Sequence, residues 1–200
     1  MLQYDDQEIV QLILAGDTDA FNVLVDRYQA RAYNLCLRML GDGDAAADVA
    51  QDAFISAYRH LPSLRGEFRP WLMRIVANAC RDALRSQKRR PTVSMDISRD
   101  EDDGPGLQIA DSADGPEDAL IHREFQQAIV TALRSIPDDQ REVIVLSDIE
   151  GRSYQEIADI TGINIGTVKS RLNRARLRMR ELLTAAELFP RVKRHTSQRE

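Results

Sequence analysis

Cysteine and histidine are scarce in this 200-residue chain, and the few that occur do not form a cluster. The two cysteines, Cys36 and Cys80, lie far apart and do not show the C-x-x-C spacing of a zinc or redox motif. The three histidines, His60, His122 and His195, are scattered as well, so no set of metal ligands is visible. We therefore expect two buried, reduced thiols and no metal centre, with a regulatory disulfide as the less favoured alternative.

Long apolar runs and recognisable catalytic groups are also missing. No apolar run approaches the roughly 20 residues that span a membrane. The acidic N-terminus, MLQYDDQEIV, lacks the basic-then-apolar pattern of a secretory signal. The chain has no Gly-rich phosphate loop and no constellation of nucleophile and base. These absences predict a cytoplasmic protein that is not inserted in a membrane, needs no cofactor and is not an enzyme by itself.

Glycine and proline are sparse, at 10 and 7 residues, which favours helices over a many-stranded β fold. Apolar residues recur at helical spacing between Gly- and Pro-containing turns, and no stretch has a convincing strand pattern. The sequence therefore predicts an all-α fold. Its expected helices cover residues 5–15, 17–40, 44–61, 68–89 with a break near Asn78, 116–135, 137–150, 153–161 and 165 to about 186.

Charge of both signs is present but segregated, although the net charge is only −5. Basic residues dominate 68–90 and 169–194, whereas acidic residues dominate Met95–Asp118, in which Arg99 is the only base. A segment rich in Asp, Gly and Pro has too few apolar side chains to fold, and this is typical of a flexible linker. We predict two small helical domains at residues 1–91 and 116–187, an acidic flexible linker at 92–115 and a basic tail at 188–200. Two basic blocks in an acidic chain favour a polyanionic partner over mere solvation.

The second domain has the pattern of a helix-turn-helix. Ser153 and Glu156 form a capping-box pattern, Gly162 ends the short helix, and Asn164 is suited to cap the long basic helix that follows. Steps of 100° place one apolar face of this helix toward the domain, formed by Ile165, Val168, Leu172, Ala175 and Met179. The opposite face carries Thr167, Ser170, Asn173 and Arg174, with the flanking cations Lys169, Arg171, Arg176 and Arg178. Such a face can reach base edges with its polar groups and phosphates with its cations.

Three segments carry recognisable motifs, in chain order Asp44–Gly66, Phe68–Pro91 and Ile136–Leu183. They resemble the extracytoplasmic-function (ECF) sigma factors of the sigma-70 family. FRPWLMRIVANACRDALRSQKRRP (Phe68–Pro91) resembles their promoter-melting segment, with Val76 where the family usually has Ala. DAAADVAQDAFISAYRHLPSLRG (Asp44–Gly66) resembles the segment that grips core RNA polymerase, and Ile136–Leu183 resembles the family's second domain. The resemblance covers most of residues 8 to 187 apart from the linker. It implies a transcription initiation factor that binds core polymerase, recognises a promoter and melts its −10 region.

The resemblance also implies roles for residues of the first domain. Four residues match positions that meet the clamp helices of the largest polymerase subunit: Asp48, Gln51, Asp52 and Phe54. A solvated acidic helix end and an ordinary core Phe are the alternatives. Asn78–Asp82 matches the family loop that captures a base flipped from the −10 element. The candidate −10 contacts are Arg74, Asn78, Arg81, Arg85, Lys88 and Arg89. Trp71 is either a core residue, which is favoured, or a stacking platform for a base.

In the second domain, the resemblance implies contacts with the −35 element. The candidate residues are Tyr154, Gln155, Thr167, Lys169, Ser170, Arg171 and Arg174. The implied partners are core RNA polymerase, through the clamp of the largest subunit and the flap of the second-largest, promoter DNA, and an anti-sigma factor.

A stand-alone helix-turn-helix regulator, with an N-terminal helical sensor or dimerisation domain, is the alternative function. It explains the C-terminal basic helix equally well, but it leaves the basic segment 68–90 and the motif at 44–66 unexplained. A nucleic-acid-processing enzyme is a third hypothesis, which the lack of catalytic groups disfavours.

Overall fold

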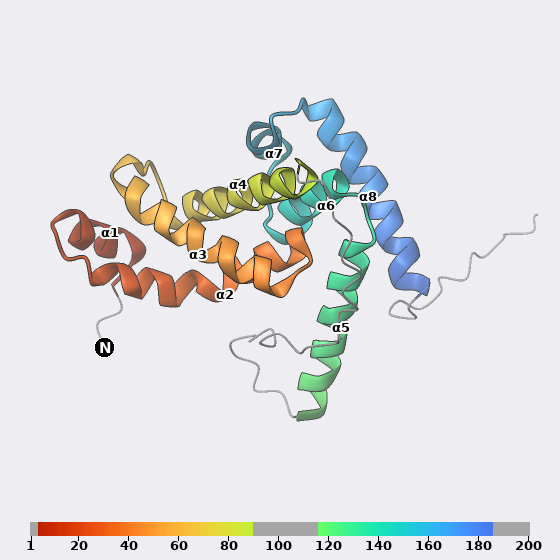
Figure 1. Cartoon of the computed structure of the whole chain (residues 1–200), viewed down its shortest axis with the longest axis horizontal. Helices are drawn as coiled ribbons and strands as arrows, with labels where there is room; N and C mark the ends of the chain where they lie inside the picture. The colour runs from red at the N-terminus through yellow and green to blue at the C-terminus, as the bar shows by residue number, and fades with distance from the viewer. Residues whose placement is uncertain (1–3, 90–115, 186–200) are drawn as a thin grey trace, which may run out of the picture.

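The computed structural model describes the backbone of residues 4–89 and 116–185, and the side chains of these residues except 88–89 and 116–124. Within these ranges every regular element is helical, which confirms the all-α prediction (Figure 1). The expected linker at 92–115 and tail at 188–200 lie outside the described residues. No described helix has the length and apolar character needed to cross a membrane.

The first domain consists of four α-helices and a short 3-10 turn. The elements are α1 (Asp6–Leu14), α2 (Ala20–Leu40), α3 (Gly43–His60), the turn Leu61–Ser63 and α4 (Phe68–Arg89). A capping box starts α1, where Asp5 accepts from the backbone N–H of Glu8 at 2.8 Å and Glu8 accepts from that of Asp5 at 2.8 Å. Helices α2, α3 and α4 pack against one another. Their core contains fully buried Leu24, Leu35 and Leu72.

Two details of the first domain differ from the sequence prediction. Helix α2 begins at Ala20 rather than at Asp17, whose side chain accepts a hydrogen bond from the Ala20 N–H at 3.2 Å. Helix α4 runs unbroken through Asn78, because nothing between Phe68 and Arg89 stops the helix and its apolar positions stay in phase with the core. Segment Asn78–Asp82 is therefore the middle of a helix and not a loop.

The second domain comprises α5 (Pro116–Arg134), α6 (Asp138–Ile144), a π-helical turn Val145–Ile149, α7 (Tyr154–Thr161) and α8 (Ile165–Ala185). The predicted capping box of α7 is present, since Ser153 Oγ accepts from the Glu156 N–H at 3.3 Å and Glu156 accepts from the Ser153 N–H at 2.9 Å. Gly162 ends α7 in the left-handed conformation at φ 71°. Helices α5, α6 and α7 all contact α8 and surround its apolar stripe.

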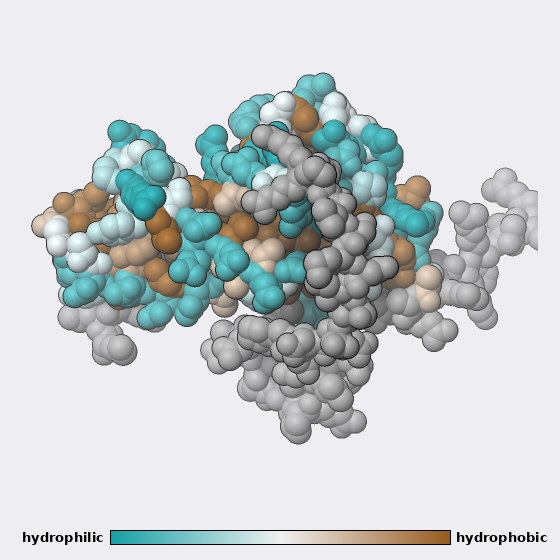
Figure 2. All heavy atoms as spheres, viewed as in Figure 1, coloured by the Kyte–Doolittle hydropathy of each residue, from teal (hydrophilic) through white to brown (hydrophobic). Residues whose placement is uncertain are grey.

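The two domains lie against each other. Helix α4 extends from the first domain to α7 of the second, and α2 contacts α5, α6 and the π-helical turn (Figure 1). The buried apolar residues of both domains form one continuous cluster. On the face shown in Figure 2, hydrophilic residues cover most of the described surface and hydrophobic residues appear in bands between them.

Candidate nucleic-acid and polymerase interfaces

Helix α8 presents a polar and basic face to solvent, supported by a buried stripe on its other side. Val168, Leu172, Ala175 and Met179 are buried, as predicted, and they meet a core that includes Val143 and Ile157. Ile165 was expected in this stripe but is 36% exposed, because it lies in the first turn of the helix. Asn164 caps the helix, its Oδ1 accepting from the Thr167 N–H at 2.8 Å.

Most of the candidate −35 residues are exposed, on α8 and in the first turn of α7. Lys169, Ser170, Asn173 and Arg174 are exposed, and Thr167 is half-buried. Tyr154 and Gln155, in the first turn of α7, are exposed as well. Several of these groups have local partners: Ser170 donates to the Thr167 carbonyl at 3.0 Å, and Arg174 Nε donates to the Ser170 carbonyl at 3.2 Å. The face is thus preorganised, polar and open, which is what contact with base edges and phosphates requires.

The three flanking arginines of α8 pair with carboxylates of their own domain, Arg178 with Glu181 of the same helix at 3.2 Å. Arg171 Nε lies 3.1 Å from Asp139 Oδ2. Arg176 makes a bidentate contact with Asp148, at 2.9 and 2.5 Å, which fastens α8 to the π-helical turn. The hydrogen bonds from Arg176 lower the pKa of Asp148. Arg176 therefore has a structural role, because its ion pair holds α8 against the π-helical turn. The spacing of basic residues in the sequence could not reveal this role.

Part of the candidate −10 surface is an open cleft of about 540 Å³ between α3 and α4. Its lining includes Trp71, Arg74 and Asn78 from α4, with Asp52 and His60 from α3. Trp71 is half-buried and packs on Phe68, with ring centroids 5.9 Å apart. Trp71 therefore belongs partly to the core and partly to the cleft. A cleft with an indole, a guanidinium and an amide combines the groups that stack on a base and hydrogen-bond to its edge.

The other candidate −10 residues do not all face solvent. Arg85 is exposed and lies 3.9 Å from Asp82. Lys88 and Arg89 belong to α4, but their side chains lie outside the described residues. Arg81 does not lie on an open surface in this arrangement, because its side chain is only 16% exposed and turns into the contact between the two domains. There it pairs with Glu142 at 3.5 Å and donates to the Ile160 carbonyl.

The candidate polymerase-binding residues also include both exposed and buried side chains. Asp48, Gln51 and Asp52 are exposed on α3, and none of the residues that the structure describes covers them. Phe54 is 8% exposed and belongs to the core of the first domain. Its proposed role as a direct polymerase contact is therefore not supported, and the alternative of an ordinary core Phe describes it. The exposed aspartates can meet a basic partner surface.

The two cysteines are neighbours in space although 44 residues separate them in sequence. Both are buried between α2 and α4, and the Cys80 thiol donates to Cys36 Sγ at 3.3 Å. This hydrogen bond, together with burial, raises the pKa of Cys80. A buried thiol with little thiolate character reacts slowly, so the pair behaves as part of the core. No group of three or more His, Cys, Asp or Glu side chains suited to a metal ion occurs in the described parts of the chain.

Comparisons with known proteins match both domains. Residues 24–90 match the family model of sigma-70 region 2, and residues 126–179 match that of sigma-70 region 4. The ECF RNA polymerase sigma-E factor of Escherichia coli K12 is 40% identical over 177 residues, which cover 87% of this chain and 92% of that protein. The corresponding factor of Haemophilus influenzae is 38% identical over 177 residues, covering 87% and 93%. The RNA polymerase sigma-H factor of Pseudomonas aeruginosa is 36% identical over 178 residues, covering 88% and 92%.

Two solved structures share the arrangement of helices. CnrH, in complex with the cytosolic domain of CnrY, is 27% identical with a TM-score of 0.57, and the match covers 90% of this chain and 97% of CnrH. The sigma factor RpoE of Bartonella quintana, in complex with the anti-sigma factor NepR, is 26% identical with a TM-score of 0.56, covering 82% and 96%. With two sigma-70 regions in order and close relatives matched over most of their length, the chain belongs to the ECF sigma factors of the sigma-70 family.

Proposed function

We propose that the chain directs core RNA polymerase to a class of promoters and helps to open them. The first domain binds the clamp of the largest polymerase subunit through the exposed row Asp48, Gln51 and Asp52. Its cleft then holds a base of the −10 element, with Asn78 reading the base edge and Trp71 stacking. Unpairing and unstacking a base costs a few kcal/mol, and this cost is offset by the cleft and by backbone contacts from nearby cations.

The second domain places α8 in the major groove of the −35 element. Thr167, Lys169, Ser170 and Arg174 supply base and phosphate contacts, with Arg171 released from Asp139 to join them. An exposed ion pair of this kind is worth about 0–1 kcal/mol, so giving it up costs little. The same domain meets the flap of the second-largest subunit. Nucleotide addition stays with the polymerase, and the work takes place in the cytoplasm, where that enzyme acts.

The observation that carries the proposal is the presence, in one chain, of two sigma-70 regions whose exposed faces have complementary chemistry. One face is an acidic row on α3, and the other is the basic, polar face of α8. A stand-alone regulator would use the α8 face but would have no use for the α3 row or the α4 cleft.

Reconstituted transcription tests whether the α3 row binds polymerase and the α8 face recognises the −35 element. The chain is combined with purified core polymerase, and run-off transcripts are mapped on a genomic promoter library. We expect Asp48→Lys with Asp52→Lys to abolish capture by polymerase, while Arg174→Ala leaves capture intact and weakens −35-dependent initiation by about 1–3 kcal/mol. Arg180→Ala, an exposed α8 residue outside the candidate −35 set, is the matched control. Specific binding of a palindrome by the chain alone, with no new start site from the holoenzyme, would refute the proposal.

An anti-sigma factor is a further proposed partner, since one of the similar solved structures is a complex with such a protein. Co-expression followed by pull-down of the tagged chain, with loss of polymerase binding as the readout, tests this partnership.

A further inference from the structure

The solvent face of α8 carries a polar side chain that the contacts proposed above leave unused, that of Asn173. Asn173 is exposed in the third turn of the helix, next to Arg174 and one turn after Ser170. The hydroxyl groups of this face already donate within the chain. Thr167 Oγ1 donates to Asn164 Oδ1 at 3.1 Å, and Ser170 Oγ donates to the Thr167 carbonyl at 3.0 Å. The donors of these hydroxyl groups are therefore not free for DNA.

The cations beside Asn173 have a different chemistry from its amide. Arg171 pairs with Asp139 at 3.1 Å, whereas Lys169 and Asn173 have no partner in the parts of the chain that the structure describes. The ammonium of Lys169 and the guanidinium of Arg174 can only donate, but an amide offers both donors and an acceptor. Among the described side chains of this face, Asn173 is therefore the one whose planar group has a free donor together with a free acceptor.

The centre of the same face consists of small residues. Steps of 100° per residue place Gly166 and Ser170 opposite the buried stripe, with Asn173 to one side and Arg174 to the other. Gly166 and Ser170 are both exposed. Small side chains at the centre let the helix backbone come close to the floor of a major groove. A side chain as short as asparagine can then reach a base edge.

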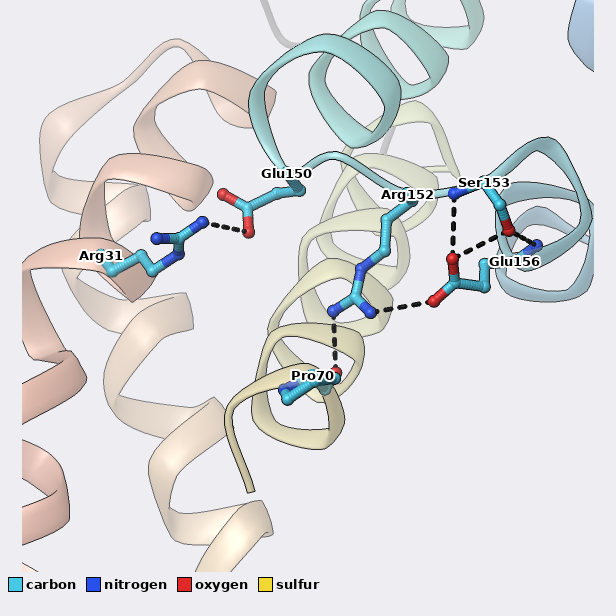
Figure 3. Close-up of polar contacts among 6 residues, drawn as sticks. All are labelled: Arg31, Pro70, Glu150, Arg152, Ser153 and Glu156. Carbon is cyan, nitrogen blue, oxygen red and sulfur yellow. Dashed lines mark hydrogen bonds and ion pairs between the residues drawn. The ribbon is translucent and has the colours of Figure 1, made fainter. Parts of the chain in front are cut away.

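The structure behind this face is held by polar contacts within the second domain. At the start of the supporting helix α7, Glu156 accepts from the Ser153 N–H at 2.9 Å and from the Ser153 hydroxyl at 2.8 Å (Figure 3). Helix α8 is held to the π-helical turn, where Arg176 Nε donates to Asp148 at 2.9 Å. Supporting contacts of this kind fix the depth and angle at which Asn173 is presented, as recognition through two hydrogen bonds requires.

We propose that Asn173 reads an adenine of the −35 element, with its amide oxygen accepting from adenine N6 and its amide nitrogen donating to N7. Adenine presents this donor and acceptor side by side in the major groove, and the other bases do not. Phosphates are bound more strongly by the neighbouring cations than by a neutral amide, so the base edge is the better partner for Asn173. This inference rests on the proposed function, which places α8 in that groove. It adds the identity of one base that the chain selects.

The test uses holoenzyme formed from core polymerase and the full chain. A promoter on which the parent holoenzyme initiates is randomised over its −35 element, and run-off transcripts from the pool are counted by sequencing. Asn173→Ala and Asn173→Arg are compared with the parent. Lys169→Ala is the matched control, because Lys169 is exposed on the same helix and its ammonium has no acceptor with which to read a base.

We expect the parent to select adenine at one −35 position and both Asn173 variants to lose this preference. Asn173→Ala should initiate about 5- to 150-fold less from the adenine promoters while keeping the parent's preferences at the other positions. Asn173→Arg should move the preference at the same position toward guanine, which arginine recognises through two hydrogen bonds. Lys169→Ala should instead weaken initiation about equally on all promoters and make it less dependent on salt.

The outcomes separate this inference from the function on which it rests. A parent that selects adenine at no −35 position overturns the inference. An Asn173→Ala variant that keeps the adenine preference, or that weakens all promoters equally, overturns it too, while initiation by the parent holoenzyme leaves the proposed function standing. If the parent holoenzyme gains no new start site, both proposals fall. Because Asn173 is exposed and alanine favours helices, the thermal unfolding of Asn173→Ala should match that of the parent.

Discussion

The most demanding prediction concerns Arg141, a buried arginine that holds the carbonyl ends of two helices. Its guanidinium donates to the carbonyls of Leu133 and Met39 at 2.8 Å each, and to those of Ile136 and Arg134 at 3.2 and 3.4 Å. The last carbonyls of a helix have no partner within it, so one side chain here satisfies the ends of both α5 and α2. Burial lowers the pKa of Arg141, which reflects the cost of placing this charge inside the protein.

Replacing Arg141 by Met keeps the length and apolar stem of the side chain but removes every donor. The Met39 carbonyl loses its side-chain donor, which costs about 1–3 kcal/mol, whereas the Leu133 carbonyl keeps the Ile136 N–H at 3.3 Å. The weaker bonds and the ion pair with Asp138 at 3.0 Å add to the loss. Because packing of the Met stem recovers part of this, we expect unfolding to become easier by about 2–4 kcal/mol. For a chain of this size, that corresponds to a fall in melting temperature of about 5–15 °C.

Thermal and urea unfolding, followed by circular dichroism, measure the effect. Arg178→Met is the matched control, since Arg178 is 55% exposed and pairs with Glu181 on the surface at 3.2 Å. The control should stay within about 0.5 kcal/mol of the parent. If Arg141→Met lowers the free energy of unfolding by no more than the control does, the assignment of Arg141 as a cap of two helix ends is refuted.

Three further changes probe single features of the fold. Asn164→Ala removes the cap of α8 and should cost about 1 kcal/mol of stability, with weaker −35 binding measured alongside the unfolding curve. Gly41→Ala puts an alanine in the left-handed conformation at φ 76° and places its Cβ 2.7 Å from Arg134 Cγ. We therefore expect urea unfolding to show a free energy of unfolding lower by at least about 1–2 kcal/mol. Asp148→Asn should destabilise the chain at neutral pH only. Because Arg176 lowers the pKa of Asp148 below its ordinary value of 3.8, the stabilisation is present above that value and disappears as the pH falls through the folded-state pKa. A difference between parent and Asp148→Asn that persists unchanged in acid contradicts the role of this pair.

The helices could be predicted from sequence because their signals are local. The capping box at Ser153–Glu156, the stop at Gly162 and the cap at Asn164 each act within four residues, and all three were confirmed. The periodicity of α8 likewise identified Val168 and Leu172 as buried. The break expected near Asn78 was wrong, because α4 has no local stop signal there and runs continuously from Phe68 to Arg89.

The candidate site was predicted less completely, since exposure depends on neighbours that the local pattern does not contain. Asp48 and Asp52 are exposed as a helical face requires, but Phe54 points to the opposite side and is buried. Arg81 follows the same basic pattern as Arg74 and Arg85. It differs from them only because the second domain covers its part of α4.

The interdomain contact has the weakest sequence signature of all, and the reason is chemical. Arg152 and Arg141 donate to backbone carbonyls of the other domain, at Pro70 and Met39, and a carbonyl is present at every residue. Such a contact requires an arginine as the donor and a suitable backbone path, but any residue can supply the acceptor carbonyl. No pair of complementary side chains in the sequence therefore indicates the contact. The Arg31–Glu150 pair does consist of two complementary side chains (Figure 3). However, 119 residues separate them, so the sequence alone does not indicate that they meet. It follows that substitutions at Pro70 which preserve the backbone should leave the interdomain contact in place. Substitutions of the arginines should weaken it, because the specificity of the contact lies in the donors.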